Sequence, residues 1–160
     1  MAGLIFRDNK EAFKVGKIKH LTGKEISLST LAEIFDNDSA QTEIKGPKNG
    51  KYLFVTYPDF AITIRKRTGG LDLYFAVAAK DNITFVSGCL FANRANMKLN
   101  FGRFAALANN EDNNLLFAII VSWSLLTKGG IIASHLISTV RAMQTAYKGL
   151  VELDTDGIIA

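Results

Sequence analysis

Two neighbouring stretches of alternating side chains constrain the fold of this chain more than any other feature. In residues 60–67 the apolar Phe60, Ile62 and Ile64 are separated by smaller or polar residues, and residues 71–77 repeat the pattern. A period of two is that of a β-strand with one buried face. Because only Thr68-Gly69-Gly70 separates the two stretches, the sequence predicts an antiparallel hairpin here.

A second hairpin is predicted in the other half of the chain. Residues 103–109 and 115–126 flank a polar turn at 110–113. The longer stretch is apolar enough for a helix, but its β-branched and aromatic content and the preceding turn favour a strand. Its odd-numbered residues from Leu115 to Leu125 are predicted to share one face. Shorter strands are expected at residues 42–45 and 52–57, on either side of a turn at residues 46–50.

Three helices are predicted from apolar residues at helical spacing, over residues 29–38, 84–96 and 131–148. In the second helix, Val86, Cys89, Leu90 and Met97 are predicted to share one apolar face. Asn93 falls on the same face and would need a hydrogen-bond partner if it were buried there. Gly149 is predicted to end the last helix.

These elements predict one α+β domain. The expected order is a helix, three or four strands, a helix, two strands and a helix, with an antiparallel sheet of about five strands. The 160 residues suit a single domain with a substantial core. Residues 26–152 are assigned to it, residues 1–25 to a basic N-terminal extension and residues 153–160 to a polar C-terminal tail.

The positive charge is concentrated near the N-terminus. Residues 1–25 carry six basic and three acidic side chains, out of a net charge of +4 for the chain. Such an extension could contact an acidic partner or nucleic acid, or could simply be solvated. The run at residues 65–67 could also touch phosphates, or could be a solvated hairpin tip, because it lacks the interleaved aromatic residues of a single-strand-binding surface. The candidate contacts to an acidic partner are Lys14, Lys17, Lys19, Arg65, Lys66 and Arg67.

No catalytic, cofactor or metal site is predicted from the sequence. His135 has no histidine or carboxylate at helical ligand spacing, and His20 lies in the basic extension, so neither is expected to bind a metal. The acidic pair Glu111-Asp112 is expected in a solvated turn, and Asp154 and Asp156 are expected in a solvated tail. Neither environment is expected to shift the pKa of a carboxyl group. Glycine motifs for phosphate binding are absent as well. The sequence therefore predicts a protein that is not an enzyme.

The expected compartment is the cytoplasm. Cys89 is the single cysteine, so no intrachain disulfide can form, which suits a reducing environment. A secretory signal is not evident, and the longest apolar run, residues 115–126, is shorter than the roughly 20 residues of a membrane helix. No membrane association is predicted.

One part of the chain resembles a known family. Asn93-Arg94-Ala95-Asn96 precedes Phe101-Gly102-Arg103-Phe104, and a hairpin, a Gly-Gly turn and a helix follow. This pattern resembles the YbjN family of bacterial sensory-transduction regulators, which have a fold similar to type III secretion chaperones. The resemblance implies a non-enzymatic regulator or chaperone-like adaptor. The resemblance implies that Asn93, Asn96 and Phe104 are motif residues with a structural role rather than a ligand-binding one. Ala95 stands where the family often has tryptophan.

Four hypotheses for the function are compatible with the sequence. The first is an adaptor that binds another protein or a peptide segment, with a homodimer formed through the even face of residues 115–126 and the last helix. The second is an immunity or antitoxin-type inhibitor of a cognate toxin. The third is nucleic-acid binding through residues 1–25. The fourth is an enzyme with a polar pocket formed by Asn93, Asn96 and Arg103.

Overall fold

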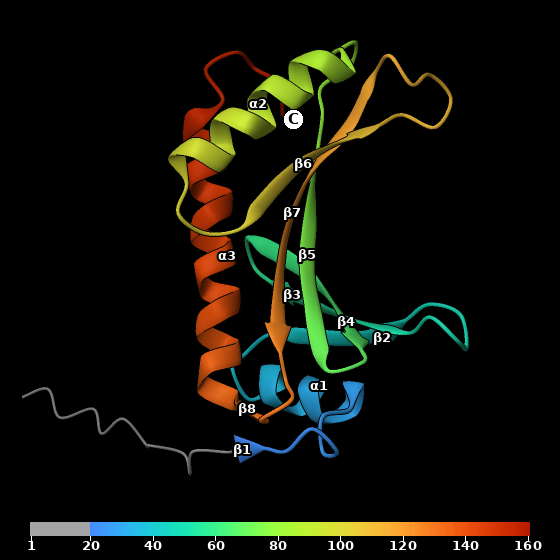
Figure 1. The fold of residues 1–160 in the computed structure, drawn as a ribbon, viewed down its shortest axis with the longest axis vertical. Coiled ribbons are helices and arrows are strands. Elements are labelled where there is room, and N and C mark those ends of the chain that lie inside the picture. The colour runs from blue at the N-terminus through green and yellow to red at the C-terminus, as the bar shows by residue number, and fades with distance from the viewer. Residues whose placement is uncertain (1–19) are drawn as a thin grey trace, which may run out of the picture.

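The computed structural model describes residues 20–160 and has a six-stranded antiparallel sheet at its centre (Figure 1). The strands lie in the order β2-β3-β4-β5-β7-β6. Their bounds are β2 (Gln41–Lys45), β3 (Tyr52–Tyr57), β4 (Phe60–Arg67), β5 (Gly70–Ala78), β6 (Arg103–Ala108) and β7 (Leu116–Leu126). The two predicted hairpins are β4–β5 and β6–β7, and they join through the β5–β7 pair.

Three helices and one face of the sheet enclose the core. They are α1 (Leu28–Asp36), α2 (Phe85–Lys98) and α3 (Ala133–Leu153). In Figure 1, α3 runs along the length of the sheet, with α1 at one end and α2 at the other. Alternate residues of β3 and β4, such as Leu53, Val55 and Ile62, are fully buried, while their neighbours on the opposite face stay partly exposed. That alternation is the period-two pattern of the sequence.

The predicted α+β class is confirmed, with small differences in the strands. The main sheet has six strands rather than about five, and a separate two-stranded sheet pairs β1 (His20–Leu21) with β8 (Ile131–Ile132). Leu21 belongs to the predicted N-terminal extension, yet its side chain is buried. The sequence signal for so short a strand is weak, because two residues cannot show a period.

A bulge in β7 shifts the alternation that the sequence predicts. Leu107 pairs with Ala118 and Ala108 pairs with Leu116, so Phe117 is an extra residue opposite β6. An extra residue disrupts the ladder locally and turns its side chain away from the regular pattern. Phe117 is consequently 59% exposed, and the predicted single face of odd-numbered residues is wrong at this end of the strand.

The apolar face predicted for α2 is not the face that packs on the sheet. The buried residues are Gly88, Phe91, Ala92 and Ala95. A Cβ atom at Gly88 would lie only 2.4 Å from Leu116 Cδ1, so the helix packs on β7 through its small residues. Close approach to the sheet is possible because three of the four buried residues are small, while Val86, Leu90 and Met97 lie on the outside.

Gly149 does not end α3, which continues to Leu153. A Cβ atom at this position would lie 2.9 Å from Leu99 Cδ2. The glycine makes room for the leucine that follows α2, and this packing role is invisible in the local sequence. The prediction of a helix end at Gly149 is therefore wrong.

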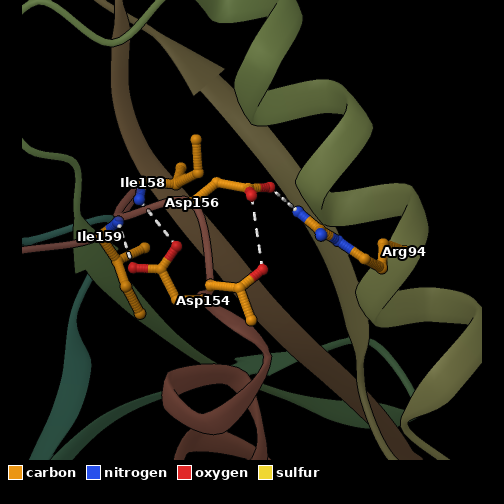
Figure 2. Close-up of polar contacts among 6 residues, drawn as sticks. Arg94, Asp154, Asp156, Ile158 and Ile159 are labelled. Atoms are coloured by element: carbon orange, nitrogen blue, oxygen red, sulfur yellow. Dashed lines mark hydrogen bonds and ion pairs between the residues drawn. The ribbon is translucent and has the colours of Figure 1, made fainter.

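The last residues pack back onto the domain instead of trailing as a polar tail. Asp154 accepts hydrogen bonds from the backbone N–H groups of Ile158, at 2.7 Å, and Ile159, at 3.1 Å, as Figure 2 shows. The backbone then pairs with the end of β5 through Lys80 N–H to Ile158 O, at 3.0 Å, and Ala160 N–H to Ala78 O, at 2.9 Å. Both isoleucine side chains are buried. One carboxylate thus holds the turn that returns the chain to the sheet.

Candidate binding surfaces

Asn96 joins α2 to β6 through two hydrogen bonds. Its Nδ2 donates to the carbonyl of Phe104 at 2.8 Å, and the N–H of Phe104 donates to Asn96 Oδ1 at 2.9 Å. The Phe104 side chain is buried in the core. Asn96 and Phe104 thus connect α2 to the edge strand of the sheet.

Asn93, the third motif position, lies elsewhere. Its side chain is exposed on the outer face of α2 and has no hydrogen bond within residues 20–160. Asn93 therefore needs no buried hydrogen-bond partner, because α2 buries the face that carries Gly88, Ala92 and Ala95 instead.

The polar pocket of the fourth function does not form. Arg103 is exposed on the face of β6 opposite to Phe104, and it lines a depression of about 270 Å³ with Ser122, Trp123 and Ser124. Asn96 is occupied by the Phe104 backbone on the helix side of the same strand. The sheet thus separates Arg103 from both asparagines.

The basic run at the end of β4 divides between the two faces of the sheet. Lys66 donates to the carbonyl of Ile26 beside α1, and Arg67 Nε pairs with Asp72 Oδ1 at 2.8 Å. Arg65 lies between two aromatic rings, 5.6 Å from the centroid of Tyr52 and 5.5 Å from that of Tyr74. Lys14, Lys17 and Lys19, the other candidate contacts, fall outside the described residues.

The open face of the sheet is the face that no helix covers. One row of paired residues crosses all six strands, namely Glu43, Phe54, Thr63, Tyr74, Ser122 and Arg103. Tyr52 and Arg65 lie beside this row. The aromatic residues missing from the sequence around Arg65 therefore come from the neighbouring strands, where a reading along the chain cannot find them.

A second exposed surface is the outer face of α2. Val86 and Leu90 are each 67% exposed and Met97 is 79% exposed. Scattered exposed apolar residues are ordinary, but three large ones on one helix face form a contiguous patch that marks a possible interaction site. We call Val86, Leu90, Asn93 and Met97 the outer α2 stripe.

An ion pair links α2 to the C-terminal segment. Arg94 donates to Asp156, which also accepts a hydrogen bond from Thr155 (Figure 2). The hydrogen bond and the charge of Arg94 lower the pKa of the Asp156 carboxyl below its usual value. The acidic pair of the predicted tail is thus structural, because Asp154 holds the turn and Asp156 holds the helix.

Tyr57 forms a second polar cluster between β3, the end of α1 and α3. Its hydroxyl donates to Asp38 Oδ2 at 2.8 Å, and Arg141 donates to the same oxygen at 3.0 Å. The Arg141 guanidinium also lies 4.4 Å from the centroid of the Tyr57 ring. Burial, followed by the hydrogen bond and the negative charge of Asp38, raises the pKa of Tyr57 well above its ordinary value.

This raised pKa predicts a late phase in an alkaline titration. The folded state favours the neutral phenol, so its contribution to stability is complete below the unfolded pKa of about 10 and is lost as the pH rises toward the folded pKa. Followed by ultraviolet absorbance, wild type should show a tyrosine that ionises late, together with unfolding. Tyr57→Phe should remove that phase. A late phase of the same size in the variant would contradict the assignment.

Two histidines far apart in the sequence meet at one pocket. His20 and His135 both line a cavity of about 320 Å³ beside β8. Within residues 20–160, however, no three His, Cys, Asp or Glu side chains gather into a group that could hold a metal ion. In the same part of the chain, no helix combines the length and the apolar character needed to cross a membrane.

Comparison with known proteins identifies the fold. No family model matches the sequence, and no curated protein matches it either. Among solved structures, YbjN from E. coli, titled "a putative transcription regulator", superimposes with a TM-score of 0.65 at 12% identity, covering 84% of this chain and 96% of that one. An uncharacterized protein from Methanothermobacter thermautotrophicus gives a TM-score of 0.59 at 14% identity, covering 82% of this chain and 99% of its own. The chain therefore has the fold of YbjN, as the resemblance between residues 93 and 104 suggested.

Proposed function

We propose that this chain is a non-enzymatic adaptor or regulator that works by binding protein, with the outer α2 stripe as a docking surface. The exposure of Val86, Leu90 and Met97 is the observation that supports this proposal. The fold is shared with a protein described as a regulator, which is compatible with it. The single cysteine suits a reducing compartment, so the proposal places the adaptor in the cytoplasm.

The spacing of the stripe favours a helix as the binding partner. Its members lie at intervals of four, three and four residues. This is the spacing of the seam positions of a coiled coil, where each side chain inserts between residues of a facing helix. The buried face, which includes Phe91 and Ala95, lies on the opposite side of α2. The helix can therefore pack on the sheet and on a partner at the same time.

The composition of the stripe favours a second copy of this chain. Asn93 is its only polar member, and a single asparagine in such a seam can pair with its equivalent and fix the register. No stripe residue is charged, and the neighbouring Arg94 is neutralised by Asp156. The stripe itself therefore brings no like charges together when two copies meet. This dimer uses α2, whereas the sequence pointed to β7 and the last helix.

Light scattering after size exclusion tests the proposal. One short helix pair buries less than the ~800 Å² per partner of a standard interface, so we expect a concentration-dependent dimer. Replacing Leu90 and Met97 together with lysine should give a monomer with an unchanged melting temperature. The matched control is Val151→Lys, at a 49% exposed position on α3, which should remain dimeric. A wild-type protein that stays monomeric at every concentration would refute the homodimer.

A further inference from the structure

The open face of the sheet carries a platform made of aromatic rings and one guanidinium. Arg65 on β4 lies between Tyr52 on β3 and Tyr74 on β5, at 5.6 and 5.5 Å from their centroids. Both tyrosine side chains are partly exposed. Next to them, Lys45 Nζ lies 4.7 Å from the ring centroid of Phe54. Aromatic rings and arginine planes are the groups on which unpaired nucleic-acid bases stack.

The open face also has a surplus of positive charge. The six strands contain only two carboxylates, and both are paired, Glu43 with Lys45 at 2.9 Å and Asp72 with Arg67 at 2.8 Å. Arg65 and Arg103 have no carboxylate partner within residues 20–160. Two unpaired guanidinium groups on a face without free acids favour an anionic ligand.

The register places these groups along one path across the sheet. Tyr74, Ser122 and Arg103 are directly paired on β5, β7 and β6. Three strand spacings separate β4 from β6, so Arg65 and Arg103 lie on the order of 14 Å apart. The path thus begins with a stacking platform, passes a serine hydroxyl and ends at a free guanidinium.

We propose that this open face binds single-stranded nucleic acid, with bases stacked on Tyr52, Arg65 and Tyr74 and the sugar-phosphate backbone contacting Arg103. An acidic peptide would satisfy the two arginines but would leave the ring platform without a planar partner. The site lies on the sheet, away from the outer α2 stripe, so it does not depend on the proposed dimer. It also differs from the sequence-based hypothesis, in which residues 1–25 make the contact.

Fluorescence anisotropy of the full chain with labelled oligothymidylate and oligouridylate tests this site. Arg103→Gln should weaken binding and reduce the slope of log K against log salt by about 0.7, because it removes a phosphate contact. Arg65→Gln should weaken binding by removing a stacking plane between the two tyrosines. Tyr74→Leu should weaken binding roughly tenfold with the slope unchanged, because it removes stacking and no charge. The matched control, Lys98→Gln, removes a positive charge from the end of α2 and should bind as wild type does. Circular dichroism melts verify that each variant is folded.

Three outcomes would overturn the proposal. The first is the absence of binding by wild type at low salt. The second is binding that survives all three substitutions and disappears when residues 1–19 are deleted, because the extension would then be the site. The third is polyglutamate that binds equally well with the same dependence on Arg65, Arg103 and Tyr74, which would identify an acidic peptide as the ligand.

Discussion

Deletion of residues 155–160 is expected to lower the free energy of unfolding by about 3–6 kcal/mol, because burial of each isoleucine side chain contributes roughly 1.5–3 kcal/mol. Ile158 and Ile159 are only 6% and 5% exposed. The deletion also removes their backbone pairing with the end of β5 and the bond between Asp156 and Arg94. Urea denaturation of both proteins measures the difference in the free energy of unfolding.

A single substitution in the same segment provides the control for this deletion. Thr155 is exposed, so Thr155→Ala should change stability by less than about 0.5 kcal/mol. If the deletion and the substitution had equally small effects, residues 155–160 would be a dispensable tail, as the sequence suggested. That result would also remove the structural role assigned to Asp154.

Asn96→Ala is expected to lower the free energy of unfolding by about 1–3 kcal/mol, since it removes two part-buried hydrogen bonds that each contribute roughly 0.5–1.5 kcal/mol. The N–H and the carbonyl of Phe104 both bond to this one side chain. Alanine is a good helix former, so the loss cannot come from helix propensity. Chemical denaturation measures the change, and the weakened contact lies between α2 and β6.

Asn93→Ala is the matched control on the same helix. It removes the same side chain from an exposed position, where the cost should stay within about 0.5 kcal/mol. Equal destabilisation by the two alanines would show that the hydrogen bonds of Asn96 add nothing beyond a generic effect of asparagine on α2. The two variants also distinguish the contribution of Asn96, which bonds to β6, from that of Asn93, which belongs to the outer α2 stripe.

The hairpins and the fold class could be predicted from the sequence because their signals are local. Phe60, Ile62 and Ile64 lie on one face of a strand whatever surrounds them, and a Gly-Gly turn leaves few ways to continue. The face of α2 could not be predicted in the same way. Its orientation depends on how closely Gly88 approaches Leu116, a residue far along the chain.

The candidate sites show the same division between local and non-local signals. The sequence drew attention to Arg65 but could not show that Tyr52 and Tyr74 flank it, because cross-strand neighbours are set by register. It also identified Asn96 through a family resemblance, while the two bonds to Phe104 became visible only in three dimensions. The grouping of Asn93 with Arg103 failed because a sheet lies between them.

The bulge at Phe117 also affects how the sheet meets other molecules of the same kind. β6 is an edge strand, and an exposed, flat edge is a template for uncontrolled growth by backbone pairing with further chains. The irregular spacing between Leu107 and Ala108 interrupts that template, and Arg103 places a charge at its other end. On the opposite edge, β2 is short and carries Glu43 and Lys45. Both edges thus discourage the aggregation to which an apolar, alanine-rich strand such as β6 would otherwise be prone.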